Sequence, residues 1–313
     1  MPTNTAQGHP VAAPVSVPVP RAYTHKSNPA EVLLTTWGQT GPDAYTVTAR
    51  WPRVHDFYLT RYGMHDPLLL SETIRQTLPL LSHGAYEVPF GHQLLWRDFR
   101  WDLDPEALAA DGEPAELTLH LTCPEVTYRR NRAASVALEV EAVRGGVRLG
   151  TARTRFAIQD RAVYERLRGR YADAAEAMAR ALPLPPPAPA RPLGRDRFED
   201  VVLSPTDGPH RWQLRTDTAH PVLFDHAVDH APGMLLIEAA RQAAQAVADP
   251  RPTIAAGMDI VFTRYAEMDA PCWILAEPLA AAADGRARVR VTARQDDTDI
   301  FSAAVTLAPA AER

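Results

Sequence analysis

The chain carries one sequence pattern twice, and this duplication restricts its possible folds more than any other feature. The segment Glu72-Thr-Ile-Arg-Gln recurs as Glu238-Ala-Ala-Arg-Gln, 166 residues later (238 − 72). Residues 91–99 align with residues 257–265 at the same separation, with apolar side chains at matching positions. Two copies of one structural unit are therefore predicted.

The separation between the copies shrinks towards the end of the chain. A turn at Gly145-Gly146 corresponds to one at Asp296-Asp297, which is a separation of 151 residues (296 − 145). The first copy should therefore contain about fifteen extra residues, since loops absorb insertions at little cost. We place them between Pro105 and Pro114.

Each copy has the pattern of one helix followed by several strands. Residues 117–121 and 287–293 alternate between apolar and polar side chains, as half-buried strands do. Helices should begin near Pro67 and near Pro232-Gly233, since proline is favoured in the first helical turn. One helix against an antiparallel sheet in each copy predicts the α+β class.

Four segments follow from this division of the 313 residues. Residues 1–22 are rich in proline and small side chains and are predicted to be a disordered arm. Residues 23–160 form the first repeat, and residues 199–313 the second. Between them, residues 161–198 are predicted to form a helix and a stiff proline-rich linker.

Composition excludes several classes of protein. The formal net charge of −5 gives no sign of nucleic-acid binding, and no apolar run is long enough to span a membrane. The first residues lack the pattern of a signal peptide. Cys123 and Cys272 are too few for a disulfide framework, so we expect reduced cysteines and a cytoplasmic protein.

The motifs in their order resemble the A-factor biosynthesis (AfsA-like) family across roughly residues 23–310. The first repeat matches that family at His25-Lys26, Val32-Leu-Leu-Thr35, Trp51-Pro-Arg53, His55, His65-Asp-Pro67, Glu72-Thr-Ile-Arg-Gln76, His83 and Val88-Pro89. The second repeat matches it at Phe224-Asp-His226, Asp229-His230, Pro232-Gly-Met234 and Glu238-Ala-Ala-Arg-Gln242. The second repeat also resembles hotdog dehydratases of fatty-acid synthesis, although its spacing between histidine and Pro-Gly is shorter.

This resemblance implies a double hotdog fold, in which each helix is wrapped by an antiparallel sheet and the two halves form an intramolecular pseudo-dimer. It also implies an acyltransferase that condenses a β-ketoacyl thioester with dihydroxyacetone phosphate. The thioester would be carried by acyl carrier protein or CoA, and the product would lead to γ-butyrolactone, butenolide or furan signalling molecules. No cofactor is implied.

The repeated motif supplies the candidate site. Its glutamate, arginine and glutamine are spaced i, i+3 and i+4, so they share one face of a helix. Hydroxyl attack on a thioester needs a base, and Glu238 is the first candidate, with Glu72 second. An ion pair that merely satisfies itself inside the fold is the structural alternative.

Other side chains complete the predicted site. His226 or His230 could share proton transfer with the glutamate base. Backbone N–H groups at Gly233, where a helix begins, could stabilise the oxyanion. The phosphate needs cations and polar donors, and the candidates are Arg241, Arg75, Gln242, Gln76 and Lys26, the only lysine of the chain.

Competing interpretations remain open from the sequence. The chain could be a hotdog thioesterase or dehydratase, or a non-catalytic acyl-binding regulator. The histidine and aspartate residues at 220–230 do not match a standard zinc spacing, so no metal site is predicted. Pro79 should kink or end the first helix, while the second helix lacks such a proline, so the two halves are not equivalent.

Overall fold

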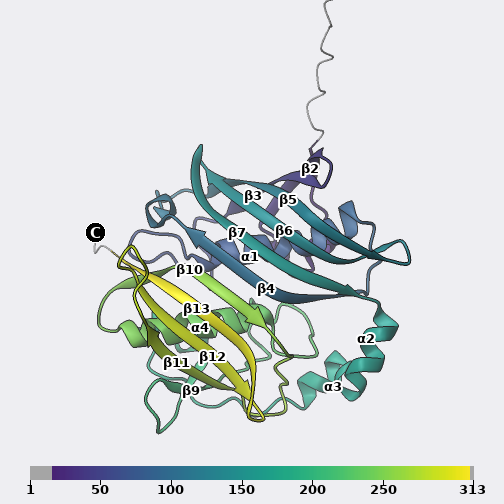
Figure 1. The fold of residues 1–313 in the computed structure, drawn as a ribbon. Helices are drawn as coiled ribbons and strands as arrows, with labels where there is room; N and C mark the ends of the chain where they lie inside the picture. Colours follow the sequence, from purple (N-terminus) through teal and green to yellow (C-terminus); the bar gives the residue numbers. More distant parts are fainter. Residues whose placement is uncertain (1–15, 311–313) are drawn as a thin grey trace, which may run out of the picture.

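The computed structural model describes residues 16–310, in which all strands join one antiparallel sheet (Figure 1). Its thirteen strands run in the order β1-β2-β3-β5-β6-β7-β4-β10-β13-β12-β11-β9-β8. Strands of the first half occupy one side of the β4–β10 junction and those of the second half the other. The strands are β1 Val17–Pro18, β2 Leu34–Gly41, β3 Ala44–Trp51, β4 Gln93–Leu103, β5 Ala115–Arg129, β6 Arg132–Arg144, β7 Val147–Gln159, β8 Leu203–Pro205, β9 Arg211–Leu214, β10 Thr253–Phe262, β11 Trp273–Leu279, β12 Ala287–Gln295 and β13 Thr298–Pro309.

One long helix belongs to each half, as the sequence predicts. Helix α1 (Leu68–Leu80) begins after Pro67, and the Asp66 carboxylate accepts a hydrogen bond from the Leu68 N–H at 2.8 Å. Helix α4 (Gly233–Ala248) begins directly after Pro232. Both helices lie behind the sheet in Figure 1, so the α+β class is confirmed.

Pro79 marks a difference between the two helices. Helix α1 ends at Leu80 and passes into a π-helical turn, η3 (Leu81–Ala85), because proline cannot donate the regular helical hydrogen bond. Helix α4 has no proline and continues regularly to Ala248. The π-helical turn carries His83, which is buried.

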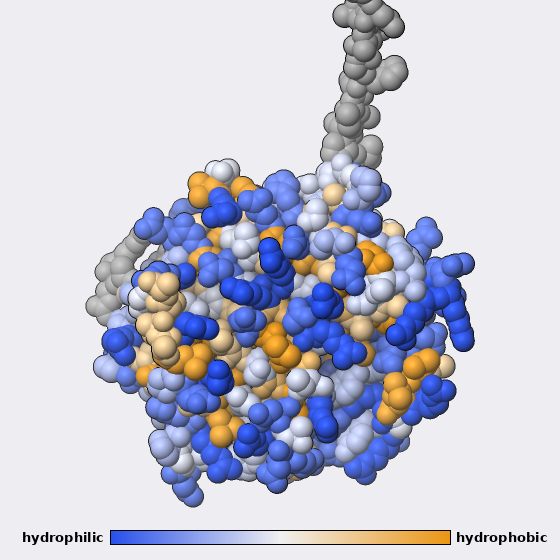
Figure 2. Space-filling model, in the orientation of Figure 1, coloured by the Kyte–Doolittle hydropathy of each residue, from blue (hydrophilic) through white to orange (hydrophobic). Residues whose placement is uncertain are grey.

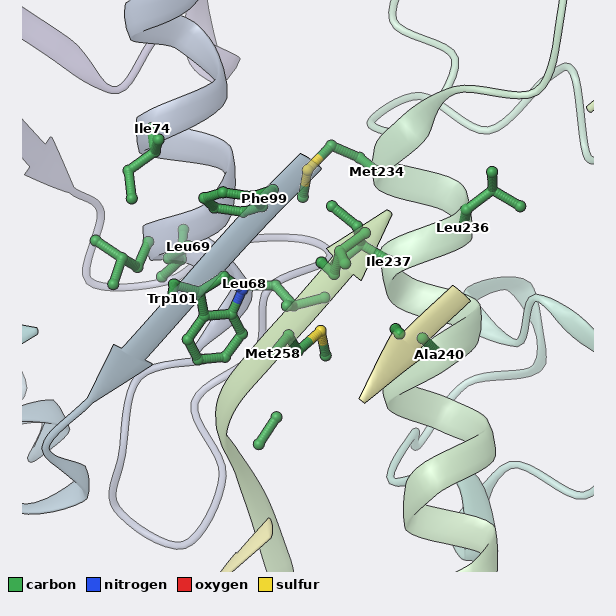
Figure 3. Packing of buried hydrophobic residues seen from close by; sticks show 14 of the residues in the cluster. Leu68, Leu69, Ile74, Phe99, Trp101, Met234, Leu236, Ile237, Ala240 and Met258 are labelled. Atoms are coloured by element: carbon green, nitrogen blue, oxygen red, sulfur yellow. The ribbon is translucent and has the colours of Figure 1, made fainter. Parts of the chain in front are cut away.

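The two halves share one hydrophobic core across the β4–β10 junction. Side chains from both helices lie over these two strands, and Leu68 of α1 and Ile237 of α4 approach each other there (Figure 3). Phe99 on β4 and Met258 on β10 are both almost fully buried beneath them. Burial of such side chains contributes about 1.5–3 kcal/mol each, so the junction is a major source of stability.

Strand pairing corrects the repeat alignment predicted for β4. Phe99 pairs with Thr154 of β7, and Met258 pairs with Val305 of β13. Thr154 and Val305 are 151 residues apart (305 − 154), which is also the separation of the two matching turns, so they are equivalent positions. Their partners Phe99 and Met258 are therefore equivalent too, at a separation of 159 (258 − 99). The similarity of residues 91–99 to residues 257–265 is therefore out of structural register by seven residues (166 − 159).

The extra residues of the first half also lie elsewhere than predicted. The connection holding Pro105 and Pro114 spans residues 104–114, about as long as its counterpart, residues 263–272. Seven extra residues instead separate helix α1 from β4 (166 − 159), and the remaining eight (159 − 151) follow β4, where strands β5 and β6 are much longer than β11 and β12. A sequence comparison detects the total length change but not its position.

The segments outside the repeats are more ordered than predicted. Residues 1–15 of the predicted arm lie outside the described residues, but β1 pairs with β2, and a 3-10 turn, η1 (Arg21–Thr24), follows. Two helices, α2 (Arg161–Arg168) and α3 (Ala174–Ala179), lie between the repeats, where one helix was predicted. The proline-rich segment packs on the second half, where the Ala188 N–H donates to the Leu203 carbonyl.

The outer face of the sheet is mostly hydrophilic, with small separate hydrophobic patches (Figure 2). Within residues 16–310, no helix has both the length and the hydropathy needed to cross a membrane. The polar motifs of the two repeats lie on helices α1 and α4, on the opposite side of the sheet (Figure 1).

Candidate active site

The first polar cluster surrounds Glu72 on helix α1 and consists of Lys26, Glu72, Arg75 and Gln76. Arg75 forms a two-pronged ion pair with Glu72, with Nε–Oε2 and Nη2–Oε1 distances of 3.0 Å each. Lys26 Nζ lies 3.1 Å from Glu72 Oε1, and Gln76 Nε2 donates to the same oxygen at 2.9 Å. The carboxylate is thus buried but fully paired, as burial of a charge requires.

The second polar cluster repeats this arrangement around Glu238 on helix α4 and consists of Arg195, Glu238, Arg241 and Gln242. Arg241 Nε donates to Glu238 Oε2 at 2.8 Å, and Gln242 Nε2 donates to Oε1 at 2.6 Å. Arg195 takes the place of Lys26, with its Nε 2.9 Å from Glu238 Oε1. Glu238 is fully buried.

Arg195 was missed by the sequence interpretation, which assigned it to a linker. A signal for it exists, because Val32-Leu33 aligns with Val201-Val202 at a separation of 169 residues (201 − 32). The same separation places Arg195 on Lys26. The 3-10 turns that precede both residues, η1 and η6 (Arg191–Leu193), each end in a left-handed residue, His25 or Gly194.

The two glutamates are held in the ionised form by their cationic neighbours. The pKa of Glu72 falls to about 2, since the pull of Arg75 and Lys26 and their hydrogen bonds outweighs the effect of burial, which raises it. The pKa of Glu238 also falls to about 2, because Arg195 and Arg241 outweigh burial in the same way. Both carboxylates are buried and their oxygens accept hydrogen bonds from neighbouring side chains, so the geometry favours a positioning role over the predicted base role.

Hydrogen bonds to the opposite half lie at or beside each cluster. The Asp225 carboxylate of the second half accepts hydrogen bonds from the Ser27 and Asn28 N–H groups, at 2.6 and 2.8 Å. Arg195 of the second half donates through Nη1 to the Phe57 carbonyl of the first half at 2.5 Å. Each cluster is therefore built at the interface between the halves.

His226 belongs to the second repeat in sequence but lies beside the polar cluster of the first half. His226 lies near the first cluster, where the positive charges of Arg75 and Lys26, together with burial, lower its pKa. It therefore accompanies Glu72 rather than Glu238. The role of His226 in proton transfer stays a prediction.

His230 belongs to a third network beside helix α2. Its Nδ1 lies 2.6 Å from Asp229 Oδ1, and its ring packs edge-on against Tyr265. Asp229 in turn accepts hydrogen bonds from Tyr164 and Arg168. Since every polar contact of His230 is to this network, it has no direct contact with either glutamate.

Gly233 lies at the start of helix α4, as predicted. A Cβ atom there would lie 3.2 Å from the Trp96 ring, which stacks on Phe262 with ring centres 5.4 Å apart. Glycine at this position therefore permits close packing of the helix start on the β4–β10 junction. The oxyanion role of its N–H group stays a prediction.

Arg75 and Arg241 differ in which guanidinium nitrogens have a hydrogen-bond acceptor in the protein. In Arg75 the Nε and Nη2 groups are used by Glu72 and the Thr24 carbonyl, and Nη1 has no hydrogen-bond partner within residues 16–310. In Arg241, Nη1 donates to the Leu193 carbonyl and to Gln245. The Arg75 side chain is 21% exposed, whereas that of Arg241 is 7% exposed.

A small recess, partly open to solvent, lies beside the second cluster. It is lined by Arg241, Gln245, His65 and Thr253, among others. Each guanidinium nitrogen of Arg241 already has a protein acceptor. The lining atoms His65 Nε2 and Thr253 Oγ1 have no hydrogen-bond partner within the described residues.

Each half contains one further histidine with a structural role, His55 in the first half and His220 in the second. His55 Nδ1 accepts hydrogen bonds from the Phe57 and Tyr58 N–H groups, and His220 Nδ1 accepts them from Val222 and Leu223. Neither is part of a metal site, since no group of three metal-binding side chains occurs in the described part of the chain. Burial raises the pKa of Cys123 to about 11 and that of Cys272 to about 12, so neither thiol is activated.

The model of the A-factor biosynthesis hotdog domain matches residues 9–160 and 177–310 of the chain. The chain belongs to this family. It is 46% identical over 294 residues to the 2-oxo-3-(phosphooxy)propyl 3-oxoalkanoate synthase of Streptomyces virginiae, covering 94% of this chain and 99% of that one. The enzyme of the same name from Streptomyces coelicolor is 39% identical, covering 91% and 90%.

A solved structure supports the same fold for this family member. The 12:0-ACP thioesterase of Umbellularia californica superposes with a TM-score of 0.50, covering 84% of this chain and 94% of that one at 7% identity. Together with the two family-model matches, this confirms the predicted double hotdog fold. At so low an identity the likeness concerns the fold alone.

Proposed function

We propose that this family member transfers a 3-oxoacyl group from a thioester to the primary hydroxyl of dihydroxyacetone phosphate. The product would be a 2-oxo-3-(phosphooxy)propyl 3-oxoalkanoate, the compound named in the relatives from Streptomyces virginiae and Streptomyces coelicolor. The observation that carries the proposal is the free Nη1 group of Arg75, held at a partly exposed position beside Lys26 and His226.

The first cluster is suited to bind a phosphate. Glu72 fixes the Arg75 guanidinium by two hydrogen bonds, which leaves the remaining N–H groups aimed in one direction. Lys26 and Gln76 neutralise and orient the carboxylate. We therefore assign Glu72 a positioning role, Arg75 the phosphate contact, and His226 a second contact from the opposite half.

The second cluster is assigned a structural role. Glu238, Arg241 and Gln242 satisfy one another and hold the segments around Asp200 and Val202 through Gln242. The order of the two glutamates predicted from sequence is thus reversed in this proposal. Gly233 is retained as the candidate oxyanion donor, since it begins helix α4 seven residues after His226.

The reaction forms one bond and breaks one. The hydroxyl oxygen attacks the thioester carbonyl, a C–O bond forms, the C–S bond breaks, and the hydroxyl proton passes through a base to the departing thiolate. No acyl-cysteine intermediate is needed, because the described thiols are buried and protonated at neutral pH. The acyl donor is proposed to be acyl carrier protein or CoA, acting in the cytoplasm.

The test supplies a 3-oxoacyl thioester on CoA and on acyl carrier protein, each with and without dihydroxyacetone phosphate. Mass spectrometry of the product and a colour assay for free thiol are read together. Ester formation that requires the phosphate supports transfer. Equal thiol release in water identifies a thioesterase, and binding without turnover identifies a regulator.

Dihydroxyacetone lacking its phosphate is the matched control for the site. It offers the same hydroxyl, so the proposal expects strong loss of kcat/KM with this acceptor. Equal use of both acceptors would remove the assigned role of Arg75 while leaving acyl transfer intact.

A further inference from the structure

We propose that His25 and His83 form a two-imidazole proton relay, in which His25 Nδ1 is the base that deprotonates the attacking hydroxyl. The inference deepens the proposed function, because it names the base that the two glutamates do not provide. It rests on hydrogen-bond geometry, on the backbone conformation of His25, and on the lack of both histidines in the second half.

The hydrogen bonds fix the direction of the relay. His83 Nδ1 lies 2.6 Å from the Val88 carbonyl oxygen. A carbonyl can only accept, so this nitrogen of His83 carries a proton. In neutral His83 the other nitrogen, Nε2, is therefore unprotonated and accepts a hydrogen bond from His25 Nε2 at 2.8 Å.

This arrangement leaves His25 Nδ1 unprotonated. No hydrogen bond to Nδ1 occurs within residues 16–310, and His25 is only half-buried, so a ligand can reach it. A proton taken up there releases the Nε2 proton of His25 to His83 Nε2. The charge then resides on His83, where the Val88 carbonyl stabilises the protonated ring.

The surroundings of the pair belong to the first cluster. Burial, then the facing charges of His83 on η3, Arg75 on α1 and His226 of the second half, lower the pKa of His25 to about 3. His25 is thus neutral in the free protein. A phosphate dianion on Arg75 and His226 would offset these positive charges and make the relay a stronger base only once the acceptor is bound.

The backbone holds His25 at an unusual conformation. Its φ of 52° lies in the left-handed region, which non-glycine residues rarely adopt without a reason. The equivalent position in the second half is Gly194, with a φ of 67°. The fold thus needs a left-handed residue here, but only the first half supplies an imidazole.

His83 is likewise specific to the first half. It lies on the π-helical turn that follows Pro79, and its ring stacks on Phe90 with centres 4.3 Å apart. The matching position after helix α4 is Asp249. A relay can therefore form beside Glu72 but not beside Glu238.

The decisive variant is His25→Gly, since glycine suits this backbone and the second half already uses it. We expect kcat to fall about 10²–10⁴-fold, the usual contribution of a general base, with partial rescue by added imidazole. His210→Gly is the matched control, because His210 is exposed and has a φ of 52°. It should leave kcat unchanged.

His83→Gln tests the second member, which acts through His25. The pH dependence of kcat should shift while KM for dihydroxyacetone phosphate stays constant, which a purely structural defect would not produce. His25→Gly with wild-type kcat overturns the relay. If His25→Gly fails to fold by circular dichroism, His25→Asn replaces it, because asparagine tolerates the left-handed region.

Nitrogen-15 NMR spectra of protein with labelled histidine show which ring nitrogen carries the proton, without any turnover. The proposal expects His25 protonated on Nε2 and His83 on Nδ1 at neutral pH, and the opposite tautomer of either ring overturns it. If wild-type protein forms no ester, the proposed function itself fails, and with it the role of the relay as the base of that reaction. If wild-type protein and His25→Gly both form ester at equal rates, only the relay fails.

Discussion

The two clusters have nearly the same hydrogen bonds but leave different groups free. Around Glu238, each guanidinium nitrogen of Arg241 donates to a protein acceptor. Around Glu72, Arg75 keeps Nη1 free, Lys26 replaces an arginine, and two histidines lie alongside. The two halves therefore share a scaffold of polar contacts, and the groups to which we assign phosphate binding and proton transfer lie around the first cluster.

The largest expected effect concerns the closed cluster. Arg241→Ala removes one partner of the fully buried Glu238, so the free energy of unfolding should fall by about 3–5 kcal/mol. Urea unfolding followed by circular dichroism measures this. If Arg241→Ala keeps wild-type stability but loses turnover, the structural role assigned to the second cluster is contradicted.

The next effect is on acid stability. Glu238 has a pKa of about 2 in the folded protein and an ordinary value of 4.5, so its stabilising contribution is present above pH 4.5 and lost as pH falls towards 2. The contribution is about 3 kcal/mol by linkage. Unfolding measured from pH 6 to pH 2 should show this slope, and Glu238→Gln should reduce it.

Arg75→Ala should lower catalysis by the folded protein, in addition to the stability lost when buried Glu72 loses a partner. It removes charge-assisted hydrogen bonds to the acceptor, each worth about 1.5–3 kcal/mol, so kcat/KM for dihydroxyacetone phosphate should fall about 10- to 150-fold. Arg75→Lys should recover part of the loss, since lysine keeps the charge but not the fork. Unchanged kinetics in a folded Arg75→Ala protein would contradict the assignment.

The smallest effect distinguishes the two left-handed positions. Gly194→Ala should lower stability by about 1–2 kcal/mol from backbone strain, and its Cβ would also displace the Gln245 side chain, whose Oε1 lies 1.9 Å from the ideal position. Turnover by the folded fraction should not change. Thermal melts and single-turnover rates measure the two quantities separately.

The sequence predicted the parts of this site that lie on regular elements. The i, i+3, i+4 spacing correctly placed Glu72, Arg75 and Gln76 on one buried helix face, and Pro79 correctly marked the end of α1. Helix starts at Pro67 and Pro232 follow from local backbone restrictions, which a sequence states directly.

Contacts across the interface could not be predicted in the same way. The nearness of His226 to Arg75, and of Asp225 to Ser27, depends on how the halves pair, which the sequence does not state. Arg195 was hidden in a proline-rich segment that looks like a spacer. The His25–His83 contact joins residues 58 apart through a π-helical turn, whose geometry has no reliable sequence signal.

The pairing of β4 with β10 within one polypeptide has an evolutionary consequence. In a dimer of identical subunits, each substitution occurs at both equivalent positions, so a mutation that improves one pocket also alters the other. Here the equivalent positions are encoded separately, although the sheet remains as continuous as in a symmetric pair. One half is free to specialise while its twin maintains the shared framework.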